Sequence, residues 1–268
     1  MISWKMPLKK AISDFLVAVG SPVAGAGQGF RILTYHSITD RPVKNEYDQM
    51  TTPKDLFDEQ MNFLEKNGYN VISPREIIDH FLQKKYMPAK TLGITFDDGF
   101  KDNLRNALPV LKKYGYKAAL FLTVNFIGED DRYLDWDDIR MLAKTDIFCF
   151  GSHTCGHRKL SALKRDDIDK EIGLSKSILE DKTNREIFLF AYPFGSYGSF
   201  NRIVKDALKR KGYNAAFTTI AGLNTSTTDP FEIRRTRISW FDNDAEFVKE
   251  LKGAYDWYRV WQRMSGTL

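Results

Sequence analysis

The strongest constraint on the fold is a repeated alternation of short apolar runs with amphipathic segments from residue 31 onward. Seven runs have the composition of buried strands: 31–36, 69–72, 91–97, 118–124, 147–152, 187–192 and 214–219. Helical patterns occupy the stretches between and beyond them: 53–66, 74–84, 103–114, 137–144, 164–182 and 199–211. The apolar runs are continuous, which is typical of a parallel sheet covered by helices.

Turn and capping residues mark the borders of these segments. Thr52–Pro53 and Ser73–Pro74 each place a proline where a helix would begin, because proline suits the first helical position. Gly68, Gly115 and Gly212 stand where a helix would end before the next strand. Since no linker or repeat interrupts the alternation, the residues predict one α/β domain, either a (β/α) barrel or an open doubly wound sheet. Both folds gather their chemistry at the carboxyl ends of the strands.

Composition and charge narrow the classes of partner. A net charge of +5 on 268 residues is mild and spread along the chain, so we expect no nucleic-acid partner. No stretch approaches the roughly 18 apolar residues that span a bilayer. Cys149 and Cys155 form no CxxC pair, and we expect them to be reduced. A thiolate ligand at Cys155, which lies between two histidines, stays an alternative.

The first thirty residues allow three interpretations. Residues 1–10 are basic, residues 11–20 are apolar but interrupted by Asp14, and small residues follow at 21–29. The helical spacing fits a helix packed on the domain, or a basic amphipathic helix that contacts a membrane surface through residues 1–20. A cleaved signal is the third alternative. We divide the chain into an N-terminal segment, 1–29, and a main domain, 30–268, and leave its location open between the cytoplasm, the membrane surface and the exterior.

An aspartate pair and a histidine pair end two of the strands. Asp97 and Asp98 follow a buried strand, where their mutual repulsion calls for a metal ion or a shared proton. Standing alone, Asp-Asp-Gly would be an ordinary turn. His153 and His157, at i and i+4, can converge on one ion, and two imidazoles with one carboxylate leave a position open for water. That set predicts one divalent metal ion, with zinc preferred and cobalt, nickel or manganese compatible. His80 falls inside a helix and needs no role.

Three motifs together resemble the polysaccharide deacetylase family, carbohydrate esterase family 4, also called the NodB-homology domain. They are Thr-Phe-Asp-Asp-Gly at 95–99, His-Thr-Cys-Gly-His at 153–157 and Tyr-Pro-Phe-Gly at 192–195. The resemblance spans residues 31 to 240. It implies a single-domain distorted (β/α) barrel with about seven parallel strands, and hydrolytic removal of N- or O-acetyl groups from carbohydrates.

The resemblance also assigns roles. It implies that Asp97 is the general base and that Asp98, His153 and His157 hold the metal. The metal would polarise the acetyl carbonyl and lower the pKa of a water molecule toward ~7, and Asp97 would take the proton of that water. The acetyl pocket and the oxyanion site would be formed by the backbone of Tyr192, Pro193, Phe194 and Gly195.

Two departures from the family pattern involve charged side chains. The arginine that usually opens the third motif and pairs with the base is replaced by Ala191. We hypothesise that Arg234, Arg235 or Arg237 substitutes for it. The late Leu-x-His motif that usually supplies the general acid is absent, because no histidine follows His157.

His36 offers a replacement for the missing acid. It lies in Leu33–Ser37, which resembles the early Tyr-His element of a permuted subgroup that includes deacetylases of poly-N-acetylglucosamine and enzymes of surface-polysaccharide pathways. In that subgroup the acid-bearing strand opens the domain. The resemblance implies that His36 is the general acid or an oxyanion stabiliser, with a structural role as the alternative.

Several aromatic residues are candidates for the walls of the site. Trp136 either stacks on sugar rings or packs in the core at the start of a helix. The stretch 38–52, with Tyr47 and Asp48, is too long for a simple connection and predicts a lid or substrate loop. We expect Trp240 and the aromatic tail at 255–261 to pack on the barrel.

The sequence therefore predicts a hydrolase of carbon–nitrogen bonds that removes acetyl groups from N-acetylated sugars of a polysaccharide or glycolipid. We expect a role in surface-polysaccharide metabolism, one divalent metal ion and no organic cofactor. Three alternatives use the same scaffold: an O-acetyl esterase, a deformylase of a lipid-linked sugar, and an inactive carbohydrate-binding homologue.

Overall fold

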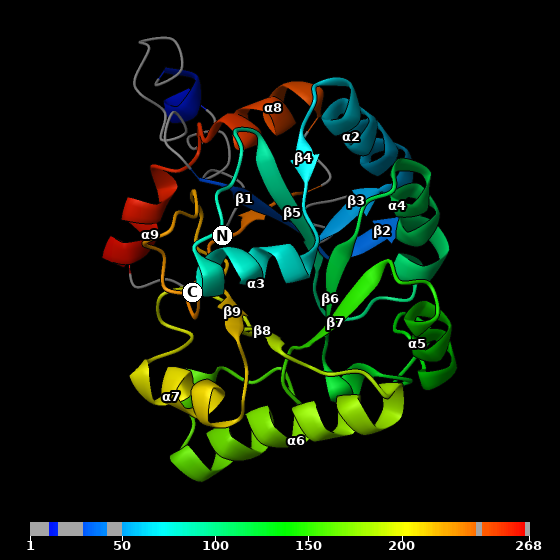
Figure 1. Ribbon diagram of the computed structural model, residues 1–268, viewed down its shortest axis with the longest axis vertical. Helices are drawn as coiled ribbons and strands as arrows, with labels where there is room; N and C mark the ends of the chain where they lie inside the picture. The colour runs from blue at the N-terminus through cyan, green and yellow to red at the C-terminus, as the bar shows by residue number, and fades with distance from the viewer. Residues whose placement is uncertain (1–10, 16–28, 42–49, 240–242, 266–268) are drawn as a thin grey trace.

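A computed structural model describes residues 11–15, 29–41, 50–239 and 243–265 (Figure 1). Within this part of the chain, one parallel sheet has the strand order β10-β1-β5-β6-β7-β8-β9, and the short strand β4 pairs with β5. Its strands are β1 (Arg31–Tyr35), β4 (Asn70–Val71), β5 (Thr91–Phe96), β6 (Ala118–Leu122), β7 (Phe148–Ser152), β8 (Leu189–Ala191), β9 (Ala215–Phe217) and β10 (Thr236–Arg237).

The last strand closes the curled sheet. The Ile233 N–H donates to the Ala216 carbonyl at 3.0 Å, and the Thr218 N–H donates to the Ile233 carbonyl at 2.8 Å. Three residues later, β10 pairs with β1 in the register Thr34 to Arg237. The same short segment thus contacts both edges of the sheet, and the predicted distorted barrel is confirmed, with seven parallel strands along its path.

Helices surround this barrel, and α3 crosses one of its ends (Figure 1). A π-helical turn, Asn103–Ala107, leads into α4, and β2 (Ser37–Thr39) pairs with β3 (Thr51–Pro53) in a second small sheet. The α-helices are α2 (Lys54–Lys66), α3 (Pro74–Gln83), α4 (Leu108–Tyr114), α5 (Trp136–Ala143), α6 (Arg165–Thr183), α7 (Arg202–Arg210), α8 (Asp244–Lys252) and α9 (Tyr258–Ser265).

Apolar side chains fill the barrel from the end that α3 covers. Ile77 and Ile78 of α3 join a buried cluster with inward-facing strand residues such as Ile32 and Phe121. A Cβ at Gly93 of β5 would lie 2.8 Å from the Cδ1 atoms of both Ile32 and Ile77, so only glycine lets α3 approach this closely. One end of the barrel is therefore sealed, and the chemistry is left to the other.

The structure confirms the predicted strands and helices with small shifts at their ends. Ser73 and Glu76 form a capping box with Pro74 at the start of α3, as the sequence predicted. The prediction that Pro53 is the first helical residue was wrong, because Pro53 ends β3 and caps α2. The two-stranded sheet, α8 and α9 were not predicted.

The N-terminal segment is described only over residues 11–15, which are helical. The buried hydroxyl of Ser13 accepts a hydrogen bond from Trp257 Nε1 at 2.9 Å, and Asp14 pairs with Lys249 of α8. These contacts favour a packed helix for this turn. The division at residue 29 and membrane contact through residues 1–20 stay predictions. Tyr47, Asp48 and Trp240 lie outside the described residues.

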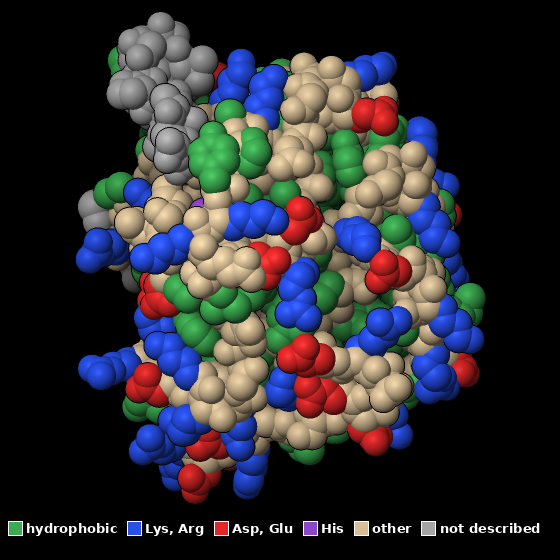
Figure 2. Space-filling model, in the orientation of Figure 1, with side chains coloured by type: hydrophobic (Ala, Val, Ile, Leu, Met, Phe, Trp, Pro, Cys, Tyr) green, Lys and Arg blue, Asp and Glu red, His purple; other side chains and the backbone are tan. Residues whose placement is uncertain are grey.

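Neither a strongly one-signed surface nor a membrane-spanning helix is seen in the described part of the chain. Figure 2 shows Lys and Arg side chains interspersed with Asp and Glu on this face, without one dominant patch. None of the helices described is long and apolar enough to cross a bilayer. The expectation of no nucleic-acid partner stays a prediction.

A buried ion pair ties the C-terminal segment to β1. The guanidinium of Arg31 donates to both carboxylate oxygens of Asp256 at 3.0 and 2.9 Å, and Arg31 Nε donates to the Leu251 carbonyl at 2.9 Å. Both side chains are almost fully buried. A bidentate pair in this environment is favourable only while it is complete.

We expect Asp256→Ala to lower the free energy of unfolding by about 3–5 kcal/mol, because it removes the carboxylate that accepts two hydrogen bonds from the buried Arg31 guanidinium. Urea unfolding followed by circular dichroism measures the loss. Asp58→Ala, which removes the exposed partner of Lys113, is the control and should cost far less. Equal losses in the two variants would contradict the structural role of the buried pair.

Candidate functional site

Two aspartates, Asp97 and Asp98, follow β5 at the open end of the barrel. The Asp97 N–H donates to the Tyr35 carbonyl of β1 at 3.1 Å, which extends the strand pairing by one residue. Asp98 then adopts a left-handed backbone, with φ of 71°. The turn in the backbone directs the two adjacent carboxylates to different surroundings, and both are buried.

Asp98 meets the two histidines that follow β7. Its Oδ1 atom lies 3.6 Å from His153 Nε2 and 3.6 Å from His157 Nε2. One ligand atom from each of these residues lies within 4.8 Å of the others. Residues from the ends of two strands separated by β6 therefore present three converging donors.

These three donors fit a divalent cation. Asp98 Oδ1 is buried and has no hydrogen-bond partner. The Nδ1–H of His153 donates to the Ala191 carbonyl at 2.8 Å, which leaves the Nε2 lone pair facing Asp98, the arrangement usual for metal-bound histidine. A tetrahedral ion about 2.0–2.2 Å from each donor would place the donors roughly 3.3–3.6 Å apart. Burial, and then the charge of Asp97, raise the pKa of Asp98 to about 7, so a cation would stabilise the ionised carboxylate.

Asp97 pairs with Arg235 inside the barrel. The guanidinium donates to both Asp97 oxygens at 2.7 Å, and also to Thr95 Oγ1 at 3.2 Å and the Thr218 carbonyl at 2.7 Å. Burial alone would raise the pKa of Asp97, but the charges of Arg235 and His153 together with the hydrogen bonds from Arg235 lower it to about 2. Asp97 is therefore a carboxylate at neutral pH.

The third motif contributes strained backbone and an exposed ring. Phe194 has a φ of 63°, is 54% exposed, and places its ring centroid 5.0 Å from that of His157. Gly195 packs so closely that a Cβ would lie 2.5 Å from Thr219 N. The side chain of Tyr192 turns away from the site, since its hydroxyl donates to the Phe231 carbonyl at 2.9 Å and its ring stacks on Phe200. Of Tyr192 and the buried Pro193, only the backbone is available to a ligand.

Left-handed backbone conformations occur at several residues around these donors. Of the eight non-glycine residues with positive φ in the described part of the chain, four lie here: Asp98 (71°), Thr154 (71°), His157 (51°) and Phe194 (63°). Such conformations are unfavourable for residues with a Cβ and persist where the surrounding structure enforces them, often at functional sites. Their gathering at one end of the barrel supports a functional site there.

His36 lies at the end of β1, within electrostatic reach of Asp97 and His157. Its Nδ1 atom is buried without a hydrogen-bond partner, and its carbonyl accepts a bond from Asn103 Nδ2 at 2.8 Å. Burial lowers the pKa of His36 to about 4, against the opposing effect of Asp97. The imidazole is neutral at neutral pH and can act as an N–H donor.

Comparison with known proteins identifies the family. The polysaccharide deacetylase profile matches residues 84–216. YxkH of Bacillus subtilis (strain 168), which carries that family's name, is 32% identical over 208 residues, covering 78% of this chain and 71% of the relative. This chain belongs to the polysaccharide deacetylase family. A poly-beta-1,6-N-acetyl-D-glucosamine N-deacetylase of Staphylococcus epidermidis is 27% identical over 248 residues, with 82% of each chain covered.

Solved structures of deacetylases share the fold. The Streptococcus pyogenes deacetylase PplD, in complex with acetate, superposes with a TM-score of 0.74 at 24% identity, covering 83% of this chain and 98% of that one. The polysaccharide deacetylase BC0361 of Bacillus cereus superposes with a TM-score of 0.72 at 26% identity, covering 84% of this chain and 69% of the other. The barrel therefore agrees with structures of this family.

Within this family scaffold, Arg235 supplies the guanidinium that the third motif lacks. Of the three arginines considered, Arg235 pairs with Asp97, Arg234 donates to the Leu223 carbonyl, and Arg237 is exposed on β10. Ala191, at the position of the usual arginine, is fully buried in the barrel interior. The hypothesis of a substitute arginine is confirmed for Arg235.

Aromatic rings that the sequence analysis missed line one side of the donors. Phe126 stacks near His157 at 5.8 Å between centroids, Tyr133 lies 4.8 Å from Phe126, and Phe100 lies 5.2 Å from Tyr133. Phe100 follows β5, whereas Phe126 and Tyr133 both lie in the connection between β6 and α5, and no local motif marks these rings. Trp136 begins α5 and packs, partly buried, against the core, so its contact with sugar stays a prediction.

The cysteines take no part in the donor cluster. Both are free, as expected for reduced residues. Burial raises the pKa of Cys155 to about 11, which favours the thiol over a metal-binding thiolate. Cys155 is also not among the three converging residues, so the structure gives the thiolate alternative no support.

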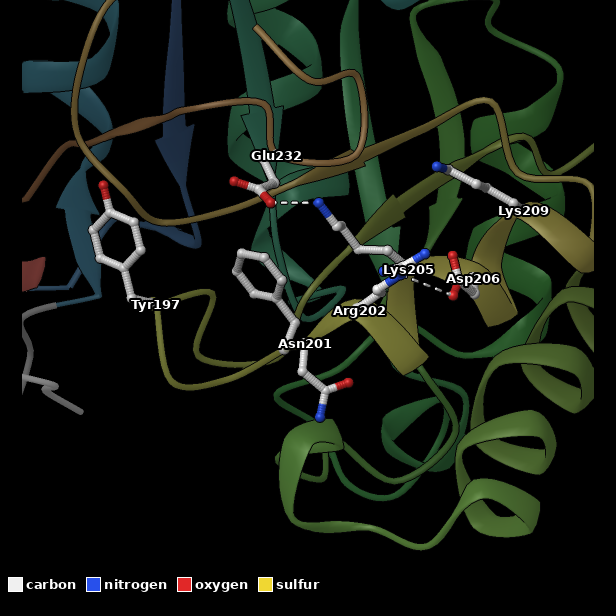
Figure 3. Close-up of a pocket in the computed structure, with 8 residues that line it drawn as sticks. Tyr197, Asn201, Arg202, Lys205, Asp206, Lys209 and Glu232 are labelled. Atoms are coloured by element: carbon white, nitrogen blue, oxygen red, sulfur yellow. Dashed lines mark hydrogen bonds and ion pairs between the residues drawn. The ribbon is translucent and has the colours of Figure 1, made fainter.

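A separate cavity of about 450 Å³ lies beside α7 (Figure 3). Lys205 donates there to Asp229 at 2.8 Å and to Glu232 at 2.6 Å, and Arg202 pairs with Asp206 at 3.8 Å. The main cations of this cavity are thus already paired with carboxylates. It is lined by Tyr197, Phe200, Asn201, Arg202, Lys205, Asp206, Lys209 and Glu232, none of which the sequence analysis selected.

We expect Arg235→Gln to raise the pKa of Asp97, because the variant removes the two charged hydrogen bonds that favour the ionised carboxylate. Carboxyl carbon chemical shifts in a pH titration of the metal-free protein measure the change. The stability lost in the variant should shrink as pH falls below about 4 toward 2, where Asp97 becomes protonated in either protein. Arg234→Gln, which alters the neighbouring guanidinium, should leave the Asp97 titration unchanged.

Proposed function

We propose that this protein hydrolyses the acetamido group of N-acetylglucosamine units in a polysaccharide, with a divalent cation held by Asp98, His153 and His157. One observation carries the proposal: the arginine-bound carboxylate of Asp97 adjoins Asp98, whose buried and unpartnered Oδ1 atom converges with donor atoms of His153 and His157. A relative named for poly-beta-1,6-N-acetyl-D-glucosamine supports the choice of sugar.

Asp97 and Arg235 would have distinct roles in the hydrolysis. When bound, a divalent cation would polarise the acetyl carbonyl and acidify water. Asp97 would accept the proton of the attacking water as general base, and Arg235 keeps that carboxylate ionised and oriented. Because Asp97 and Asp98 adjoin in the chain, the base is held at a fixed position relative to the donors.

Charge that develops on the acetyl oxygen needs hydrogen-bond donors. We assign this role to the backbone of Phe194 and Gly195, whose left-handed conformation turns it out of the strand. His36, with its neutral imidazole, would donate a hydrogen bond to the oxyanion or pass a proton to the departing amine. Both assignments rest on the family resemblance and on the placement of these residues at one end of the barrel.

The aromatic surroundings suit a sugar chain. The rings of Phe194 and Phe126 both lie near His157, and aromatic faces pack well against the apolar faces of sugar rings. We infer a polymeric or lipid-linked acetylated glycan as the substrate class, in surface-polysaccharide metabolism. Zinc is the preferred ion, with cobalt, nickel or manganese compatible with the same donors.

We expect the protein to release acetate from β-1,6-linked N-acetylglucosamine oligomers, and the release to stop when a chelator removes the ion and to return when Zn²⁺ is added. Enzymatic detection of acetate measures it, with O-acetylated xylan and a formylated lipid-linked sugar as parallel substrates. Asp97→Asn, which keeps the metal donors, is the control for protein-borne activity.

The outcomes of this panel are distinct. Release from xylan alone would replace the proposal with an O-acetyl esterase, and release of formate alone would replace it with a deformylase. Stoichiometric metal binding without release from any substrate would leave a carbohydrate-binding homologue. Activity that survives complete metal removal would refute the metal site.

We expect His36→Ala to lower kcat by about 10²–10⁴-fold, the usual contribution of a positioned acid or hydrogen-bond donor, while metal content stays at the wild-type level. Steady-state kinetics and elemental analysis of the same preparation check both points. His80→Ala, in α3 at the sealed end of the barrel, is the matched histidine control. Loss of metal in His36→Ala would show that this residue is a ligand instead.

A further inference from the structure

The loop between the two histidines has an unfavourable conformation that something must hold. It contains two non-glycine residues with left-handed backbone, Thr154 (φ 71°) and His157 (φ 51°), within four positions. His153 is held at the end of β7 by two hydrogen bonds, from its backbone N–H to the Leu122 carbonyl and from its ring Nδ1–H to the Ala191 carbonyl. His157 depends more on the loop, because it is partly exposed and lies beyond the turn.

The backbone N–H groups of this loop identify what holds it. Ser152 Oγ accepts from Thr154 N at 3.2 Å, and Thr154 Oγ1 accepts from His157 N at 2.9 Å. These two bonds are made within the segment itself. The remaining two N–H groups, of Cys155 and Gly156, both donate to a single atom, Oε2 of Glu171, at 3.0 and 2.8 Å.

Glu171 comes from α6, sixteen residues after Cys155. It is 9% exposed, so its carboxylate is withdrawn from water and relies on these two donors and on Arg158, whose Nη1 lies 3.9 Å from Oε1. A Cβ at Gly156 would lie 3.3 Å from the same Oε1 atom. The loop and the carboxylate are therefore closely fitted, and a long helix braces the segment between the two histidines.

We propose that Glu171 is a positioning residue for the metal centre, which sets the spacing of His153 and His157 through the backbone N–H groups of Cys155 and Gly156. The inference rests on the proposed metal site. Glu171 is not one of the three converging metal donors. It holds the turn in the strained conformation that brings His157 within 3.6 Å of Asp98. Without it, the two left-handed residues can relax and carry His157 away.

The test is Co²⁺ binding by the purified, metal-free protein, measured by calorimetry and by the visible absorption of bound Co²⁺. Glu171→Ala should weaken Co²⁺ affinity about 10- to 100-fold, the usual effect of losing a partner that orients metal ligands, and should change the absorption spectrum. Glu171→Gln keeps an acceptor oxygen for both N–H groups and should recover most of the affinity and the wild-type spectrum.

Glu180→Ala is the matched control, because Glu180 lies on the same helix and accepts a backbone bond from Ile187 N at 3.0 Å, away from the histidine loop. It should lower thermal stability without changing Co²⁺ affinity or spectrum. Gly156→Ala disturbs the same contact from the loop side and should weaken Co²⁺ binding less than Glu171→Ala. If Glu171→Ala does not fold, Co²⁺ binding by Gly156→Ala tests the positioning role of Glu171.

Two results would overturn the inference. Folded Glu171→Ala that binds Co²⁺ with wild-type affinity and spectrum would show that Glu171 only fills its place in the fold. If Glu171→Ala is unfolded, wild-type binding by Gly156→Ala would do the same. Failure of the wild-type protein to bind Co²⁺ would instead refute the proposed metal site, so the two failures are told apart.

Discussion

The ion pair between Arg235 and Asp97 lies inside the barrel, and much of the surrounding structure is arranged to satisfy it. A guanidinium without solvent contact must find a partner for its N–H groups. Here they donate to Asp97, Thr95 and the Thr218 carbonyl, while the rings of Phe121 and Phe217 lie within 6.0 Å of the guanidinium carbon. These contacts fix which residues of β5 and of the closing segment point inward.

Two adjacent carboxylates acquire opposite properties from this arrangement. Burial raises the pKa of both, but Arg235 faces Asp97 and brings its pKa to about 2, while Asp98 faces neutral imidazoles and the charge of Asp97, and its pKa rises to about 7. One aspartate is thus ionised in the protein alone, whereas the other gains stability as an anion when a cation binds. Paired groups with separated pKa values are typical of sites with distinct base and ligand roles.

Sequence patterns predicted the α/β class and the convergence of Asp98, His153 and His157 because both depend on local signals, whereas the choice of a barrel over an open sheet came from the family resemblance. Apolar runs identified the strands, and side chains directly after them converge in any parallel barrel. Which of Arg234, Arg235 and Arg237 faces Asp97 could not be predicted, since it depends on the pairing of Thr34 with Arg237 across 200 residues of chain. The role of Glu171 could not be predicted for a related reason. In the sequence of a helix rich in charged residues, nothing distinguishes a carboxylate that will be buried from those that will be exposed.

The substitution at position 191 shows how a barrel can deliver the same group from different strands. Side chains that point inward from β8 and from the closing segment share one interior, so either strand can supply a guanidinium to Asp97. Ala191 is fully buried, and a long side chain there would compete for the volume that Arg235 and its flanking rings fill. The small side chain of Ala191 therefore goes together with the large side chain of Arg235 in the packing of this interior. Because Arg235 arrives on the segment that closes the sheet, the orientation of Asp97 depends on barrel closure, whereas the donors on β5 and β7 do not require it.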